Sequence, residues 1–545
     1  MDEICPTFLD LDLLTRWDAD LGGDAGEVLC YIMSLSGFRR SLIDENFSDK
    51  AIRRSNITID NRACLEAWGT IANLTFAEAK VILKAFQVQK KGGTDRLVLD
   101  GTPLNAASVP GHKVHLNSIH HILFELLKFN FSVTIDAKSY FYQFKIADSV
   151  AAYFAVLISK RRGRALCRAL TRMCMGWRHA PCIAQRSSRT ILLELRRRLL
   201  SKGLQLDDFY ADVWIDNFIF AAHTLDVLNF VLTTFEAVAL DLNLKLHPPS
   251  PQSSVVDVLG FSVDLASKVI RHSSKWVSKV TEFWTSHSHI DAVWSFRDWA
   301  KMVGNLVWMA YARRLPLCFI PQTLTLARSL AVEGPGHWES NANHLKSADL
   351  MLELAALVDA IPNAFTYPSP LPLELTLMSD AATGDGLDEA FWAFISEDEH
   401  SGESCSFAGP IPFSEEHIFF MELRSAMHAL LHAAFENPAQ RVNIGIDNSA
   451  ALFALRSGHS GNGIADAWIA RFYRALPSTF QFYALHVPSE LNRSDRFTRG
   501  LRPQNYFSIQ GLHAWPGQRI PQNSPRACSS LMSVSSEALD ISDSA

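Results

Sequence analysis

The sequence predicts a mixed α/β and α+β protein that is divided into several domains. At 545 residues the chain is longer than the size at which a single hydrophobic core stops growing. Short apolar runs of strand length, at residues 131–136 and 210–222, carry carboxylates at or near their ends. After about residue 370, strand patterns alternate with longer runs of helical period, which is typical of an α/β domain.

Composition excludes several classes of protein. The hydrophobic content of 48% and the charged content of 20% are those of a globular chain. No apolar run reaches the length of a membrane span, and the first residues lack the basic and apolar regions of a secretion signal. The nine cysteines include no C-x-x-C pair, which argues against a zinc ribbon or a disulfide framework. We therefore expect an intracellular protein, cytoplasmic or nuclear, without a membrane partner.

Charge is distributed unevenly along the chain. The net charge is 51 − 57 = −6, yet residues 160–202 contain thirteen Lys or Arg and a single acid, Glu194. A local charge of 13 − 1 = +12 favours contact with a phosphate backbone. The alternative is a solvated helix face, although such faces usually mix both signs.

Local patterns predict the following elements in chain order. A Gly-containing turn at residues 90–95 leads into a strand that ends at Asp100, and a helix follows Pro181. Strands are expected at 131–136 and on both sides of residue 216, a helix at 224–240, and a short strand or hairpin at 255–263. Residues 273–360 have a mainly helical period. The last α/β unit is predicted as strand 374–379, helix 420–435, strand 442–447, helix 463–475 and strand 480–487.

Asp216 and Asn217 stand between two apolar runs, which predicts a strand, a tight turn and a second strand. Asp and Asn tolerate the positive φ that a two-residue hairpin needs, so we expect these two residues to form the turn. Asp136 ends another apolar strand. Two carboxylates on neighbouring strands can hold a divalent metal near a phosphate. The alternative is an ordinary hairpin turn without chemistry.

The string T-I-D-A-K-S-Y-F-Y-Q-F at residues 134–144 resembles the first palm motif of reverse transcriptases, particularly in retrotransposons. The resemblance implies that Asp136 is a metal ligand and that Phe141 excludes a ribose 2′-hydroxyl. The string M-G-W-R-H-A-P at 175–181 resembles the next motif, in which Met175 and Gly176 approach the nucleotide. W-I-D-N at 214–217 is similar to the [YF]-x-D-D signature and implies that Asp216 is the second metal ligand.

Weaker similarities occur in the family's order. Lys90, Lys91 and Arg96 fall where the fingers cover the triphosphate, and R-L-V-L-D-G-T-P-L-N at 96–105 is similar to a family motif. Lys245 is a candidate for the lysine that protonates pyrophosphate. Leu259-Gly-Phe261 resembles the primer-grip hairpin. A competing alignment of the signature on Asp212 fits less well, because that residue lies inside the apolar run.

The chain departs from the polymerase pattern at three positions. Trp214 replaces an aromatic Tyr or Phe, Met175 stands where Gln is frequent, and Asn217 replaces the second Asp. Some RNA virus polymerases also have an Asp-Asn turn. We expect the second Asp to lie further from the metals than the first. Its loss should therefore weaken metal binding or change the preferred metal.

Four acidic motifs resemble RNase H. They are S-D-A-A with Asp380, M-E-L-R-S-A with Glu422, I-D-N-S-A with Asp447, and V-P-S-E-L-N-R-S-D-R-F-T-R with Asp495. The resemblance implies that these acids converge on two metals and cut the RNA of a hybrid. The last motif is one residue shorter than usual, and Glu490 stands where His is frequent. Each acid alone could be a surface residue, and Asp495 could be a helix cap.

Together the motifs resemble the reverse transcriptase–RNase H region of a retrotransposon polyprotein, most like the tyrosine-recombinase type. The implied fold is a right-hand polymerase (fingers, palm and thumb) followed by an RNase H-like α/β domain. The implied partners are an RNA template, a DNA primer, an RNA–DNA hybrid and deoxynucleoside triphosphates, and the implied cofactor is Mg²⁺ or Mn²⁺, two ions per site. Alternatives are a nuclease with a degenerate polymerase half and a non-catalytic nucleic-acid-binding relic. The expected division is 1–85 (N-terminal helices and fingers), 86–270 (fingers and palm), 271–370 (thumb and connection), 371–510 (RNase H-like) and 511–545 (disordered tail).

Overall fold

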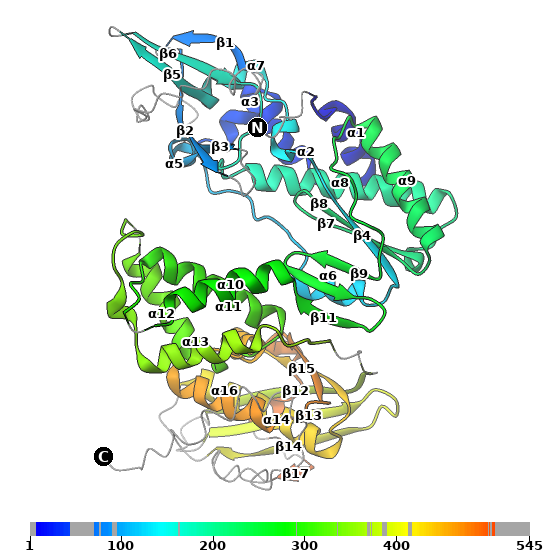
Figure 1. The fold of residues 1–545 in the computed structure, drawn as a ribbon. Helices are drawn as coiled ribbons and strands as arrows, with labels where there is room; N and C mark the ends of the chain where they lie inside the picture. The colour runs from blue at the N-terminus through cyan, green and yellow to red at the C-terminus, as the bar shows by residue number, and fades with distance from the viewer. Residues whose placement is uncertain are drawn as a thin grey trace. The chain divides into compact units, whose positions relative to one another are not determined.

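The computed structural model of the chain divides into two units, Met1–Ser273 and Ser274–Ala545. Each unit combines sheets with helices, so the mixed α/β class is confirmed (Figure 1). No helix in the described part of the chain is both long and apolar enough to cross a membrane. The structure describes residues 7–43, 70–75, 78–89, 95–161, 164–289, 291–334, 336–367, 371, 373–383, 390–411, 417–499, 501 and 504–506.

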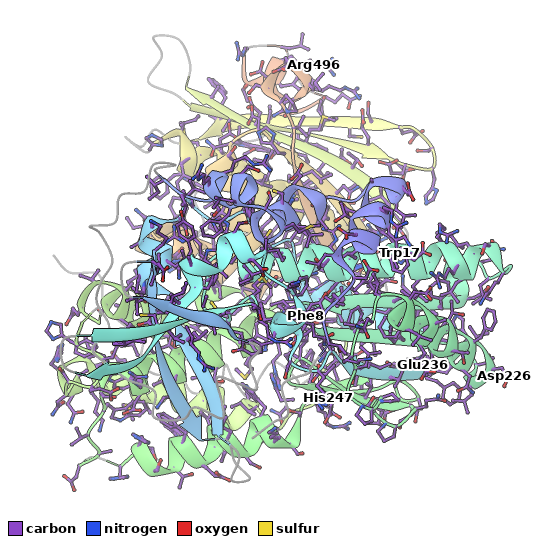
Figure 2. All side chains as sticks on the ribbon, turned by 90° about the horizontal axis from the view of Figure 1, so that it is seen from above. Phe8, Trp17, Asp226, Glu236, His247 and Arg496 are labelled. Atoms are coloured by element: carbon purple, nitrogen blue, oxygen red, sulfur yellow. The ribbon has the colours of Figure 1, made fainter. Side chains whose placement is uncertain are left out.

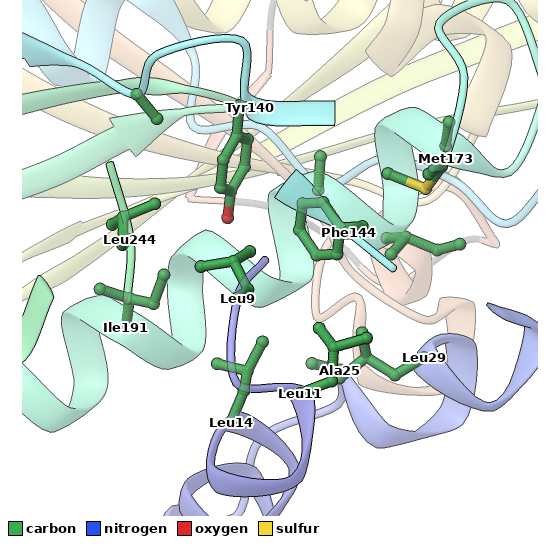
Figure 3. Close-up of a cluster of buried hydrophobic side chains, with 14 of the residues drawn as sticks. Leu9, Leu11, Leu14, Ala25, Leu29, Tyr140, Phe144, Met173, Ile191 and Leu244 are labelled. Atoms are coloured by element: carbon green, nitrogen blue, oxygen red, sulfur yellow. The ribbon is translucent and has the colours of Figure 1, made fainter. Parts of the chain in front are cut away.

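Three short helices begin the first unit: α1 (Leu11–Leu21), α2 (Gly26–Met33) and α3 (Leu35–Arg40). Asp10 caps α1 by accepting a hydrogen bond from the Leu13 amide. Their apolar faces join the largest core cluster of the unit, in which Leu9 and Leu14 lie with Tyr140 and Phe144 (Figure 3). These helices are therefore part of the main core.

A sheet of order β1-β6-β5-β2-β3 follows in the first unit. Its strands are β1 (Thr70–Thr75), β2 (Ile82–Gln89), β3 (Asp95–Asp100), β5 (Ala155–Arg161) and β6 (Arg164–Leu170). The expectation of helices throughout residues 1–85 is wrong for β1 and β2. β1 pairs with β6 and β2 pairs with β5, in each case more than 70 residues further along the chain, and β2 also pairs with β3. Cross-strand pairing of this kind overrides local helical pattern. The short helices α5 (Thr102–Ala107) and α6 (Ile119–Leu126) come after β3.

A second sheet, of order β4-β8-β7, is antiparallel. Its strands are β4 (Phe131–Asp136), β7 (Phe209–Trp214) and β8 (Asn217–Ala222). The long helices α8 (Ala180–Ser201) and α9 (Leu225–Asp241) pack against it. Residues of β7 and β8 are buried on both faces, which explains why these runs are apolar without alternation.

Three small elements follow β4: the 3₁₀ helix η1 (Tyr140–Gln143), helix α7 (Asp148–Ala151) and the 3₁₀ helix η2 (Ala152–Phe154). The unit ends with a third sheet, β9 (Val255–Val258), β10 (Phe261–Asp264) and β11 (Val269–His272). Leu259 and Gly260 form the turn between β9 and β10, both with positive φ, 50° and 91°. This is the pattern of a type I′ hairpin, as predicted for residues 255–263.

The second unit begins with four helices: α10 (Ser274–His287), α11 (Phe296–Ala312), α12 (Pro321–Glu333) and α13 (Ala348–Ala360). Their core contains Trp294 and Trp299, whose rings stack with centroids 3.8 Å apart. The mainly helical pattern of residues 273–360 therefore predicted this part correctly.

A six-stranded sheet of order β16-β15-β12-β13-β14-β17 completes the second unit. Its strands are β12 (Leu373–Thr383), β13 (Ala390–Asp398), β14 (Ser404–Ile411), β15 (Arg441–Ile446), β16 (Gln481–His486) and β17 (Asn505–Tyr506). Its helices are α14 (Ile418–Glu436), α15 (Ser449–Ser457), α16 (Gly463–Ala475) and the short α17 (Asp495–Thr498). The predicted segments correspond to β12, α14, β15, α16 and β16, whereas β13, β14 and α15 were not predicted.

A buried carboxylate joins the N-terminal helices to α8. Asp18, which is only 4% exposed, accepts hydrogen bonds from the amides of Ala25 (3.0 Å) and Gly26 (2.8 Å) and from the hydroxyl of Thr190 on α8 (2.6 Å). Three donors therefore depend on this single side chain.

We expect Asp18→Ala to lower the free energy of unfolding of the first unit by about 2–4 kcal/mol, because buried donors lose a charged acceptor. Chemical denaturation followed by tryptophan fluorescence would measure this. Asp20→Ala is the matched control, since Asp20 is exposed on the same helix. Equal effects of the two substitutions would contradict the role assigned to Asp18.

Candidate active sites

Asp136 and the β7–β8 hairpin meet at one edge of the β4-β8-β7 sheet. Asp136 ends β4 and lies in register with Asn217, the first residue of β8. The Ala137 amide donates to the Asp216 carbonyl (2.8 Å), so Asp136 and Asn217 form a non-hydrogen-bonded pair. The Cβ atoms of such pairs lie about 4.5–5.5 Å apart. Asp136 is exposed, and Asp216 and Asn217 are half-buried.

The turn of this hairpin lies one residue earlier than predicted. Its two residues are Ile215 and Asp216, because Trp214 pairs with Asn217. The positive φ of 60° falls on Ile215 and not on Asp or Asn. A β-branched residue with a positive φ is strained by about 1–3 kcal/mol. The prediction that Asp216 and Asn217 form the turn is therefore wrong, and Asn217, which we expected to lie further out, directly faces Asp136.

Two polar side chains of α8 stabilise the strained turn. Gln185 accepts a hydrogen bond from the Ile215 amide (2.6 Å) and donates to the Val213 carbonyl (3.1 Å). Ser188 donates to the Ile215 carbonyl (2.6 Å). Both side chains are buried. Sequence reasoning missed both; the available signal was a pair of polar residues three apart on a helix face that is otherwise apolar.

The acids at this edge suit a divalent cation less fully than three carboxylates would. The described residues contribute the carboxylates of Asp136 and Asp216 and the amide of Asn217. The Asn217 Oδ1 is buried and has no hydrogen-bond partner in the part of the chain that the structure describes. Carboxylate and amide oxygens are acceptable ligands for hard cations. The set fits a metal, with one negative charge fewer than the usual family pattern implies.

Asp212, the competing candidate for the signature, is buried and bound within the fold. Its carboxylate is 6% exposed and accepts hydrogen bonds from Asn117 (2.8 Å) and from the hydroxyl of Tyr210 (2.7 Å). Burial and the neighbouring Asp212 charge raise the pKa of Tyr210. Asp212 therefore ties the segment before α6 to β7.

Gly176 permits a close backbone approach, but the partner is the protein's own chain. Its φ is +99°, and a Cβ there would lie 2.7 Å from the Leu99 carbonyl oxygen. A Cβ on Gly101 would lie 2.2 Å from the Gly176 oxygen. The Asn105 side chain stabilises this contact: it donates to the Gly176 carbonyl (2.7 Å) and accepts from the Arg178 amide (2.7 Å). The neighbouring Met175 is half-buried against the core.

The remaining polymerase candidates differ in how fully they are described. Phe141 lies in η1 and is half-buried against the core, and Lys245 lies beside Lys138, whose amide donates to the Lys245 carbonyl (2.9 Å). The backbone of Arg96 lies in β3 opposite Val88. Lys90 and Lys91 lie outside the described residues.

Most described arginines of the basic stretch are committed to the fold. Arg186 pairs with Glu27 (2.7 Å), and Arg198 pairs with both Glu194 (2.7 Å) and Asp241 (2.8 Å). Arg189 is exposed. Folding contacts therefore neutralise part of the charge of +12 that was read from the sequence. The arginines with carbonyl or carboxylate partners include Arg172, Arg178, Arg186, Arg196, Arg197 and Arg198.

Three acids converge in the second unit. Asp380 lies on β12, Glu422 on α14, and Asp447 directly after β15. Each offers one carboxylate oxygen, and these oxygens all lie within 4.8 Å of one another. Neighbouring strands β12 and β15 are parallel, so their carboxyl ends meet at one edge and bring Asp380 and Asp447 together.

This cluster has the electrostatics of a cation site. Burial, then the charges of Asp380 and Asp447, raise the pKa of Glu422 to about 9. Burial and the neighbouring acids raise the pKa of Asp380 to about 6. Glu422 Oε2 and Asp447 Oδ1 are buried without a hydrogen-bond partner among the described residues. A bound divalent cation would satisfy both oxygens and favour the ionised forms, so the residues fit such an ion.

Asp495 lies close enough to Asp380 to raise the pKa of that carboxyl, but it is not one of the three clustered acids. It opens α17 without capping it and accepts a hydrogen bond from Arg499 (2.8 Å). Thr498, on the same turn, donates to the Asp380 carboxylate. Glu490, which stands where the motif often has His, is exposed.

Comparison with known proteins finds similarity only at the level of structure. No family model matches the chain. No curated protein sequence matches it. Similar solved structures include a foamy viral protease-reverse transcriptase dRH in complex with double-stranded DNA (14% identity, TM-score 0.44), covering 80% of this chain and 72% of that one. Another is a foamy viral protease-reverse transcriptase in complex with an RNA/DNA hybrid (15% identity, TM-score 0.45), covering 83% and 57%.

Metal affinity of the acid cluster should rise with pH. The raised pKa of Glu422 means that the folded, metal-free protein holds a proton there up to about pH 9. An unfolded Glu loses that proton near its ordinary value, so the metal-free unfolding free energy falls as pH rises between these two values. Cation binding must displace the proton, so Mg²⁺ affinity should increase by up to about tenfold per pH unit between pH 6 and 8.5.

Calorimetric titration in buffers of different ionisation enthalpy measures both the affinity and the released proton. In Glu422→Gln the proton release assigned to this residue should disappear. A wild-type affinity that is independent of pH, or proton release that persists unchanged in the variant, would contradict this assignment.

Proposed function

We propose that the chain is an RNA-directed DNA polymerase that also cleaves the RNA strand of RNA–DNA hybrids. The observation that carries the proposal is the convergence of Asp380, Glu422 and Asp447, distant in sequence, within 4.8 Å. Each also stands in a string similar to RNase H. In the same way, the position of Asp136 beside the turn that contains Asp216 supports the polymerase half of the proposal.

In the nuclease centre the protein's task is to hold acids that repel one another. Asp380 and Asp447 are fixed by adjacent parallel strands, and Glu422 is fixed by α14 above them. Thr498 restrains one Asp380 oxygen by hydrogen bonding. Asp495 supplies a fourth carboxylate at the rim. Two bound Mg²⁺ or Mn²⁺ ions would supply activation of water and neutralisation of the phosphate charge.

In the polymerase centre Asp136 and Asp216 would hold the corresponding pair of ions near the primer 3′-hydroxyl and the triphosphate. Phe141 would select deoxynucleotides by excluding a 2′-hydroxyl, and Lys245 would donate a proton to pyrophosphate. Lys90, Lys91 and Arg96 would contact the triphosphate, with Met175 and Gly176 beside the base pair. The substrates are then an RNA template, a DNA primer and deoxynucleoside triphosphates.

A second candidate is a nuclease whose polymerase half has lost activity. The observation that favours it is the register of Asn217 directly opposite Asp136, which puts a neutral amide where the family has an acid. Trp214 and Met175 are further departures. A third, weaker candidate is a non-catalytic binding protein, which predicts hybrid binding without cleavage.

The proposed enzyme belongs to a retroelement. The strings at residues 176–181 and 487–499 are most similar to those of retrotransposons of the tyrosine-recombinase type, and we propose that the chain comes from such an element.

The two activities should separate by substitution. Asp136→Asn should abolish primer extension on an RNA template and leave hybrid cleavage unchanged, and Asp380→Asn should do the reverse, because each removes a metal ligand of one centre. Gel-based extension and cleavage assays on the full chain measure both. Extension absent from the wild type with cleavage intact would favour the second candidate. Equal loss of both activities in either variant would show that the two sites are misassigned.

Asn217→Asp should strengthen metal binding in the polymerase centre. It restores a carboxylate opposite Asp136, and we expect extension with Mg²⁺ to increase by about tenfold, which corresponds to ~1.4 kcal/mol of barrier. Without metal, the two opposed carboxylates should lower stability by up to about 1 kcal/mol. Asn229→Asp, an exposed change on α9, controls for net charge. Unchanged Mg²⁺ dependence in Asn217→Asp would argue against a metal near this residue.

A further inference from the structure

Gln143 joins three segments of the first unit that are distant in sequence. Its side chain is fully buried (0% exposed) at the end of η1. Its Nε2 donates to the carbonyls of Lys138 (2.7 Å) and Lys245 (2.9 Å), and its Oε1 accepts from the Lys245 amide (2.9 Å). Its backbone carbonyl accepts from the Leu9 amide (2.9 Å). Every polar atom of the carboxamide therefore has a partner.

The chemistry of this position requires a primary amide. Two donors and one acceptor on one group of this length are found only in Gln, since Glu offers no donor when ionised and Met offers none at all. The Lys245 carbonyl accepts twice, from Gln143 and from the Lys138 amide (2.9 Å), which uses both of its lone pairs. A buried network that is fully satisfied in this way fixes its members firmly.

The segment that Gln143 holds runs directly along the end of β4. Lys138 faces Lys245, Ala137 bridges to Leu246, and the His247 amide donates to the Asp136 carbonyl (2.8 Å). Lys245 is thereby placed two register positions from Asp136. Its own backbone amide and carbonyl are both bound to the Gln143 side chain, so its Cα position depends on that side chain.

The N-terminal segment holds the same region from the other side. The Asn243 side chain donates to the Phe8 carbonyl (2.9 Å), and the Asp10 amide donates to the Leu242 carbonyl (3.0 Å). Arg172 lies over the Phe8 ring at 4.1 Å. Phe8, which binds Asn243, and His247, which binds Asp136, are labelled in Figure 2. Residues 242–247 are therefore bound between residues 8–10 and residues 136–143.

We propose that Gln143 is a positioning residue that fixes Lys245 beside Asp136, an inference that rests on the proposed polymerase function. Gln143 would not touch substrate. It would determine whether the Lys245 ammonium reaches the pyrophosphate that leaves when the primer 3′-oxygen attacks the α-phosphorus. Residues 8–10 belong to the same arrangement, so the N-terminal segment contributes to the polymerase centre.

The test is Gln143→Met, which keeps length and volume but removes all three side-chain hydrogen bonds. In single-turnover nucleotide incorporation we expect the maximal rate to fall by about tenfold or more, with the nucleotide KM changed less than about threefold. The pH profile should change in the same way as in Lys245→Ala. The double variant should be no slower than Lys245→Ala alone. Losses that multiply in the double variant would overturn the proposal.

The matched control is Gln440→Met in the second unit. Gln440 is also a buried glutamine (5% exposed) whose Nε2 donates to a carbonyl, that of Ala433 (2.6 Å). It should lose stability without changing nucleotide incorporation. Hybrid cleavage should be unchanged in Gln143→Met, which distinguishes a local effect from general unfolding.

A measurement without substrate separates this proposal from the proposed function. Amide hydrogen exchange should rise selectively over residues 242–247 in Gln143→Met, because the Lys245 amide loses its acceptor. If the wild type extends no primer, the polymerase function fails, and exchange alone then tests the positioning of this segment. Exchange over residues 242–247 that matches the wild type would overturn the role of Gln143.

Discussion

The position of Asp216 depends on three hydrogen bonds that α8 supplies to a strained turn. Ile215 has a φ of 60°, at a cost of about 1–3 kcal/mol. Gln185 binds the Ile215 amide and the Val213 carbonyl, and Ser188 binds the Ile215 carbonyl. At about 0.5–1.5 kcal/mol each, these bonds offset the strain. Because both side chains are buried in a rigid helix, the turn has one position relative to the end of β4, where Asp136 lies.

The same helix connects the turn to the N-terminal helices, and this explains why they belong to the core. Thr190, two residues beyond Ser188, donates to the buried Asp18 carboxylate, and Arg196 donates to the Ala211 carbonyl on β7. One face of α8 thus holds the hairpin and another holds α1 and α2. The N-terminal segment also binds Gln143 and Leu242 through backbone hydrogen bonds. The N-terminal residues therefore support the region around Asp136 and Asp216 in two ways. Residues 9–10 bind Gln143 and Leu242 directly, and Asp18 binds α8, which in turn holds the turn.

The candidate acids could be predicted from sequence because each follows or interrupts a distinct apolar run or sits in a recognisable string. The fold class and most of the long elements followed from hydrophobic period. The turn could not be predicted, since local preference favours Asp or Asn at positive φ, and tertiary hydrogen bonds from α8 impose it on Ile215 instead. Gln143 and Gln185 were missed for a related reason: each has a partner that is distant in sequence, 102 and 30 residues away, and a polar residue in the sequence does not show which distant backbone group it binds.

The two candidate sites differ in how repulsion between their acids is reduced. In the second unit three carboxylates are buried together, and the metal-free protein reduces their charge by holding protons, as the pKa of Glu422 near 9 indicates. In the first unit the acids are more exposed, and the residue in closest register with Asp136 is a neutral amide. An acid at residue 217 would add like-charge repulsion across a close pair on a hairpin that already bears the strain of Ile215. Asn217 therefore favours the stability of the metal-free hairpin at the expense of charge available to a cation.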